Sequence, residues 1–238
     1  MINPAEYIDQ RIASVCCYCG DSNPLTVDHI PAKVFLDEPY PSQLPTVKAC
    51  AKCNEKASMD EEYVACFLEA LACGSTNDEV LERKKIVSAL NHAPGLRRKI
   101  QDSLHFEETP CYTDVSEFFS RYRTIVEKSA IGFSRWYGGI VAIPVDVKTF
   151  LLDQLPAKSF EQFNNVANLH HEVYPEVASR LLHIIAETNS TSVKWEIFQP
   201  ERFRVAIWQR THGIEIRMVF REIAGASVFC TEFPDCRG

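Results

Sequence analysis

Two Cys-x-x-Cys pairs constrain the fold of this chain more than any other feature of its sequence. Cys16 and Cys19 form the first pair, and Cys50 and Cys53 form the second. Two such pairs can present four thiolates to one tetrahedral Zn²⁺ ion. Gly20 follows the first pair and allows the chain to reverse there. The spacing therefore predicts a structural zinc site, which staples a segment too small to bury a sufficient core alone.

The rest of the sequence favours metal thiolates over disulfide bonds. The 238 residues include ten cysteines, but the polar N-terminus lacks the basic start and apolar stretch of a secretion signal. No apolar run reaches the length of a transmembrane helix. We therefore expect a cytoplasmic protein with no membrane contact, in which the cysteines stay reduced.

The charge balance limits how this chain can bind nucleic acid. Its net charge is −7, which argues against a protein that coats nucleic acid through bulk positive charge. A bound metal ion and a short basic stripe can still hold a few phosphates locally. The composition is thus compatible with a nuclease but does not favour one.

Local patterns predict an α+β fold. Residues 25–30 form an expected strand, and Ser58 with Glu61 forms a capping box ahead of a helix that ends near Gly74. Further helices are expected at 78–90, 95–104, 114–127 and 175–188. The last fifty residues alternate apolar and polar positions, and His212-Gly213 is an expected hairpin turn. We expect a zinc-stapled ββα module in residues 1–75, followed in 76–238 by a helical region and a C-terminal antiparallel β-rich segment.

The residues between and after the cysteine pairs carry a family resemblance. Asp28-His29-Ile30-Pro31 lies between the pairs, and Asn54 follows the second pair directly. The order Cys-x-x-Cys-Gly, Asp-His-Ile-Pro, Cys-x-x-Cys-Asn resembles the zinc-ribbon HNH endonucleases of the ββα-metal, or His-Me finger, class. Asn54 stands where the last motif position is usually histidine. The resemblance covers about a fifth to a quarter of the chain.

This resemblance implies a metal-dependent endonuclease. His29 would be the general base that activates water, since the histidine pKa lies near neutrality. Asp28 and Asn54 would hold one Mg²⁺ or Mn²⁺ ion on the scissile phosphate, because carboxylate and amide oxygens suit hard ions. Lys33 and Lys56 are candidate substrate-binding residues.

The expected substrate is double-stranded DNA, in a setting such as phage defence or restriction. One HNH module has one cutting site, so a double-strand break calls for a homodimer, two visits or a partner such as a defence-system protein. Two alternatives stay open. A non-catalytic zinc-binding interaction module is favoured by the net acidity and by the missing middle asparagine of the motif. An RNase or toxin nuclease would share the chemistry, and the role of residues 76–238 is left open.

Overall fold

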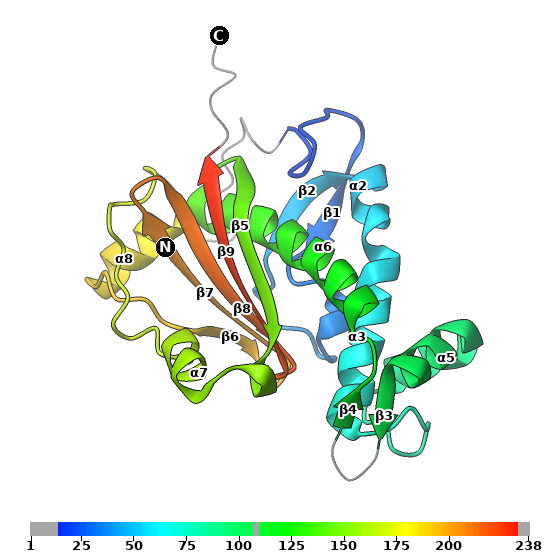
Figure 1. Cartoon of the computed structure of the whole chain (residues 1–238). Helices are drawn as coiled ribbons and strands as arrows, with labels where there is room; N and C mark the ends of the chain where they lie inside the picture. Colours follow the sequence, from blue (N-terminus) through cyan, green and yellow to red (C-terminus); the bar gives the residue numbers. More distant parts are fainter. Residues whose placement is uncertain (1–13, 107–109, 233–238) are drawn as a thin grey trace.

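The computed structural model describes residues 14–106 and 110–232, and it combines helices with antiparallel sheets (Figure 1). The strands are β1 (Leu25–His29), β2 (Thr46–Cys50), β3 (Leu104–Phe106), β4 (Pro110–Tyr112), β5 (Ala142–Leu151), β6 (Glu196–Gln199), β7 (Phe203–Arg210), β8 (Gly213–Phe220) and β9 (Ala224–Glu232). The helices are α2 (Ala51–Lys56), α3 (Ser58–Cys73), α4 (Lys84–His92), α5 (Pro94–Ser103), α6 (Ser116–Phe133), α7 (Ala157–Asn164) and α8 (Arg180–Thr188). Single helical turns are η2 (Lys33–Phe35), η3 (Ser134–Gly138) and η4 (Leu152–Gln154). The expected α+β class is confirmed.

The N-terminal part is an antiparallel strand pair followed by two consecutive helices. Strands β1 and β2 pair so that Leu25 faces Cys50 at one end and His29 faces Thr46 at the other. Helix α2 begins directly after Cys50. Helix α3 ends at Gly74, whose left-handed backbone (φ 62°) matches the expected glycine stop.

The predicted capping box at the start of α3 is wrong. The hydroxyl of Ser58 donates to the carbonyl of Glu55, and the backbone N–H of Glu61 donates to the carbonyl of Ala57. Ala57 keeps a right-handed helical conformation between α2 and α3. The first turn of α3 therefore continues a preceding helix, and its backbone donors need no side-chain cap.

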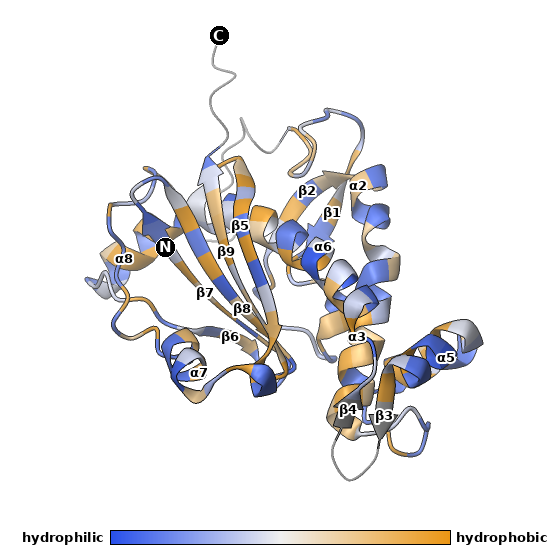
Figure 2. Ribbon diagram, in the orientation of Figure 1, coloured by the Kyte–Doolittle hydropathy of each residue, from blue (hydrophilic) through white to orange (hydrophobic). Residues whose placement is uncertain are grey.

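The C-terminal part is built on a five-stranded antiparallel sheet in the order β5-β9-β8-β7-β6. The expected turn at His212-Gly213 is confirmed, because Arg210 pairs with Gly213 across the β7–β8 hairpin. Helix α6 lies between this sheet and α3 (Figure 1). Hydrophobic residues concentrate along α3 and alternate with hydrophilic ones in the strands of the sheet (Figure 2).

One hydrophobic core connects the hairpin, α3, α6 and the C-terminal sheet. The rings of Phe35 and Phe220 meet edge to face at 5.0 Å between centroids. A Cβ at Gly132 of α6 would lie 2.0 Å from Cδ1 of Ile30, so glycine allows the helix to approach the end of β1 closely. The core thus includes residues on both sides of position 75, and the expected boundary between 1–75 and 76–238 stays a prediction. Within residues 14–106 and 110–232, no helix is both long and apolar enough to cross a bilayer.

Candidate functional site

The first cysteine pair lies in a tight turn that is fixed by backbone hydrogen bonds. The N–H of Gly20 donates to the carbonyl of Cys16 at 2.9 Å, and the N–H of Cys16 donates to the carbonyl of Asp21 at 2.8 Å. Gly20 adopts a left-handed conformation (φ 74°) that closes this turn. The N–H of Cys17 donates to the carbonyl of Lys48, which ties the turn to β2.

The second cysteine pair brings its thiols to the same place. Cys50 ends β2, and Cys53 follows within α2. The sulfur atoms of Cys16, Cys19, Cys50 and Cys53 all lie within 4.8 Å of one another. The Sγ atoms of Cys19 and Cys50 are 3.8 Å apart, which matches the edge of about 3.8 Å expected for a tetrahedron with Zn–S bonds of about 2.3 Å.

These four thiols have the chemistry of a structural metal site. All four are free of disulfide bonds. Burial opposes ionisation of Cys16, but N–H donors at Cys50, Cys19 and Tyr18 lower its pKa to about 7. Thiolates suit soft or borderline ions such as Zn²⁺. The four cysteines of the two Cys-x-x-Cys pairs can therefore hold a structural metal such as zinc. Cys17 is buried outside this cluster, near the carbonyl of Ile131.

Asp28 is buried and already bound to other side chains. Only 6% of this residue is exposed. The hydroxyl of Tyr18 donates to its Oδ2 at 2.7 Å, and Nζ of Lys128 lies 2.9 Å from the same atom. Lys128 also lies 2.8 Å from Oε1 of Glu61 in α3. The predicted metal-binding carboxylate thus forms an ion cluster with a lysine from α6.

Asn54, the other predicted ligand, lies on the same side of the hairpin. Its Nδ2 donates to Oγ1 of Thr26 at 3.1 Å. Thr26 and Asp28 share one face of β1 because side chains alternate along a strand, and they lie about 7 Å apart along it. The amide therefore borders the face that carries Asp28, but its printed hydrogen bond is to Thr26. Metal binding by Asp28 and Asn54 stays a prediction.

His29 lies on the opposite face of β1, at the end of the hairpin away from the cysteines. Its side chain is half-buried and shares this outer face with Val27 and Lys48. Burial lowers the pKa of His29, and the charge of Lys33 lowers it further. The imidazole is therefore neutral near pH 7, which is the form that accepts a proton.

The two predicted substrate lysines lie in different surroundings. Lys33 begins η2 just after His29, and its Nζ lies 5.1 Å from the ring centroid of Tyr40. Lys56 ends α2 and is exposed. Lys33 borders His29 closely enough to affect its pKa, so it is the better placed of the two to contact a substrate held there.

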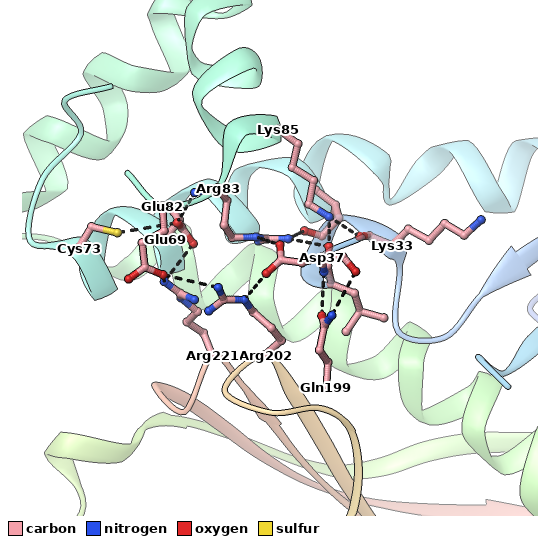
Figure 3. A network of polar contacts seen from close by, with 12 residues as sticks. Lys33, Asp37, Glu69, Cys73, Glu82, Arg83, Lys85, Gln199, Arg202 and Arg221 are labelled. Carbon is pink, nitrogen blue, oxygen red and sulfur yellow. Dashed lines mark hydrogen bonds and ion pairs between the residues drawn. The ribbon is translucent and has the colours of Figure 1, made fainter. Parts of the chain in front are cut away.

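The loop between β1 and β2 is anchored by a polar network that reaches the C-terminal sheet (Figure 3). Asp37 in this loop pairs with Arg83 at 2.7 Å and with Arg202 at 2.6 Å. Gln199 forms two hydrogen bonds with the backbone of Asp37, one through its carbonyl and one through its NH₂ group. The loop that carries Lys33 is thus held by Arg83 and by two residues of the C-terminal region, Gln199 and Arg202, which lie 162 and 165 positions from Asp37 in the chain.

The residues around Asp28 were not identified from the sequence. Tyr18 lies in the sequence between Cys16 and Cys19, the two cysteines of the first pair. The sequence pattern assigns Glu61 to a helix cap. Lys128 lies far from both residues in the sequence, but its position on its helix indicates that it has an acidic partner. It lies beside Ile125 and Gly132 at the edge of the apolar face of α6, where a largely buried lysine needs an acidic partner.

Comparisons with protein-family models, with curated proteins and with solved structures found no match to this chain.

Proposed function

We propose that the hairpin β1–β2 and the helices that follow it form an HNH-type endonuclease module that hydrolyses phosphodiester bonds in DNA. The observation that carries this proposal is the position of His29 at one end of a two-stranded hairpin whose other end is joined by the four-cysteine cluster. A helix follows the second strand directly, in the strand–strand–helix order of that class.

His29 is the proposed general base. Its neutral ring takes a proton from water, the water oxygen bonds to phosphorus, and the bond from phosphorus to the leaving oxygen breaks. The half-buried position on the outer hairpin face leaves the ring accessible to a substrate. Lys33 supplies positive charge beside it for a phosphate oxygen.

A divalent ion would stabilise the charge that develops on the leaving oxygen. Asp28 and Asn54 are the residues that would hold it, since both offer hard oxygen donors. The chemistry of the donors fits Mg²⁺ or Mn²⁺, but Asp28 would first have to release the ammonium group of Lys128.

The test is cleavage of supercoiled plasmid by zinc-loaded protein with Mg²⁺ or Mn²⁺, using linear duplex DNA and RNA as further substrates. His29→Ala should reduce the rate by a factor of about 10²–10⁴, the usual contribution of a general base. The matched control is His183→Ala, which changes an exposed histidine of α8 whose ring pairs with Glu187 within one helical turn. Equal cleavage by wild-type protein and His29→Ala would contradict the proposal.

The ion cluster at Asp28 favours a second candidate, a non-catalytic zinc module that binds a partner. A carboxylate that is neutralised by a lysine and buried has no need of a metal ion. This candidate predicts stoichiometric zinc and no metal-dependent cleavage of any substrate in the same panel. Cleavage that depends on His29 would exclude it.

A further inference from the structure

Four segments of the chain converge on the ammonium group of Lys128. Asp28 comes from β1, Glu61 from α3, Tyr18 from the cysteine turn and Lys128 from α6. The side chains of Lys128, Asp28 and Glu61 are only 12%, 7% and 13% exposed. The cluster is therefore a built ionic site in the interior, and not a surface ion pair held loosely by solvent-exposed side chains.

The geometry resembles that of a cation held by oxygen donors. Nζ of Lys128 lies 2.9 Å from Asp28 Oδ2 and 2.8 Å from Glu61 Oε1, and it lies 5.6 Å from the centroid of the Tyr18 ring. Tyr18 also donates its hydroxyl hydrogen to Asp28 Oδ2, which fixes the orientation of that carboxylate. The cluster pairs two carboxyl groups with one ammonium group, whereas a divalent ion would balance the charge of two carboxylates.

Building on the proposed nuclease function, we infer that Lys128 is an internal counter-ion that competes with the divalent ion for Asp28. The ammonium group occupies the cation position, and the ion binds there only when Lys128 moves away. Glu61 then becomes an additional oxygen donor for the ion. The four-carbon stem of lysine allows Nζ to leave while α6 keeps its packing against the core. Metal occupancy is thereby linked to the position of a side chain from the C-terminal region.

The free energy lost when Lys128 leaves its hydrogen bonds sets the size of the expected change in affinity for the divalent ion. A hydrogen bond to a charged group contributes about 1.5–3 kcal/mol net, which corresponds to roughly tenfold to hundredfold in an equilibrium constant. Removing the ammonium while keeping the length of the stem should therefore raise the affinity for a divalent ion by about tenfold or more.

The experiment is a Mn²⁺ titration of the full-length, zinc-loaded protein followed by electron paramagnetic resonance. Lys128→Met should bind one Mn²⁺ at least about tenfold more tightly than wild-type protein, whereas Lys128→Arg, which keeps a cation, should not. Adding Asp28→Asn to Lys128→Met should remove the gain. Zinc content and circular dichroism show whether each variant is folded. The same Mn²⁺ affinity in wild-type protein and folded Lys128→Met would overturn the inference.

A second measurement uses only wild-type protein, in case Lys128→Met does not fold. The side-chain nitrogen resonance of Lys128, observed by NMR in lysine-labelled protein, should move toward that of a solvated lysine as Mg²⁺ is added. An unchanged resonance at a Mg²⁺ concentration that displaces bound Mn²⁺ from the protein would overturn the exchange.

The outcomes separate this inference from the proposed nuclease activity. A gain in Mn²⁺ affinity in Lys128→Met without cleavage by either protein supports the ion exchange and contradicts the nuclease. Cleavage that depends on His29, together with equal Mn²⁺ affinity in the two proteins, contradicts the exchange and leaves the nuclease intact.

Discussion

Arg83 offers the most direct test of how the loop after β1 is held. Its side chain is 4% exposed, and Nε contacts Asp37 Oδ1 at 2.7 Å. Its Nη2 donates to the backbone carbonyls of Val34 at 2.7 Å and of Leu36 at 2.9 Å. Arg83→Ala removes all three contacts, although the buried carbonyl of Leu36 keeps a hydrogen bond from Nζ of Lys85. Asp37 is about one third exposed and keeps Arg202, so part of the penalty is relieved.

We expect Arg83→Ala to lower the free energy of unfolding by about 3–4 kcal/mol, near the lower end for breaking a buried ion pair. For a chain of this size, that corresponds to a fall in melting temperature of about 6–16 °C. Urea unfolding of zinc-loaded protein, followed by circular dichroism, measures the change. The matched control is Arg123→Ala, because Arg123 forms an exposed pair with Glu127 that should contribute no more than about 0.5 kcal/mol. A loss below about 1 kcal/mol in Arg83→Ala would refute the idea that this guanidinium anchors the loop.

Three further predictions follow from the structure. Cys50→Ser should lose zinc and melt at a lower temperature, because a structural metal contributes folding energy directly. Elemental analysis measures the zinc content, and an unchanged content would contradict the four-thiol site. Gly213→Ala should destabilise the protein by at least about 2 kcal/mol in urea unfolding, since its Cβ would lie 2.0 Å from the carbonyl oxygen of Cys230. The control Gly95→Ala meets no atom within 4 Å and should be neutral or slightly stabilising. Equal effects of the two substitutions on the free energy of unfolding would refute this packing. Burial raises the pKa of Asp37, but Arg202 and Arg83 lower it more, so its folded-state pKa lies below the ordinary value. The stability from this carboxylate is therefore fully present above about pH 4 and is lost as the pH falls through the folded pKa. Asp37→Asn should flatten the acid limb of a stability–pH curve, and an unchanged limb would contradict that contribution.

The parts of the fold that local sequence determines were predicted well. The strand at residues 25–30 alternates apolar and polar side chains, and β1 covers Leu25–His29. The four cysteines carry their own spacing signal, and the structure brings their sulfur atoms together. Gly74 ends α3 because a left-handed residue there closes the helix without strain.

The parts that depend on distant contacts were not predicted. Asp28 was expected to face a metal ion, but it contacts Lys128, which lies one hundred positions further along the chain. Glu61 matched a capping pattern, yet α2 continues almost directly into α3, and its carboxylate pairs with the same lysine. No local periodicity encodes such a pair, because the packing of α6 against the hairpin creates it.

Asn54 illustrates the same limit within a motif. The resemblance assigns it to a metal ion, and the structure shows its amide donating to Thr26. A motif defines the residue types and the order along the chain. The orientation of each side chain depends on neighbours that the motif does not contain.

Anomalous diffraction from crystals of the zinc-loaded protein grown with Mn²⁺ and a DNA oligonucleotide would test the central claim most directly. We predict a manganese peak in ligand contact with the carboxylate of Asp28, with Lys128 withdrawn from that carboxylate and the scissile phosphate beside His29 at the same end of the hairpin. Bound DNA with no manganese at Asp28, and with Lys128 still paired to that carboxylate, would contradict the account.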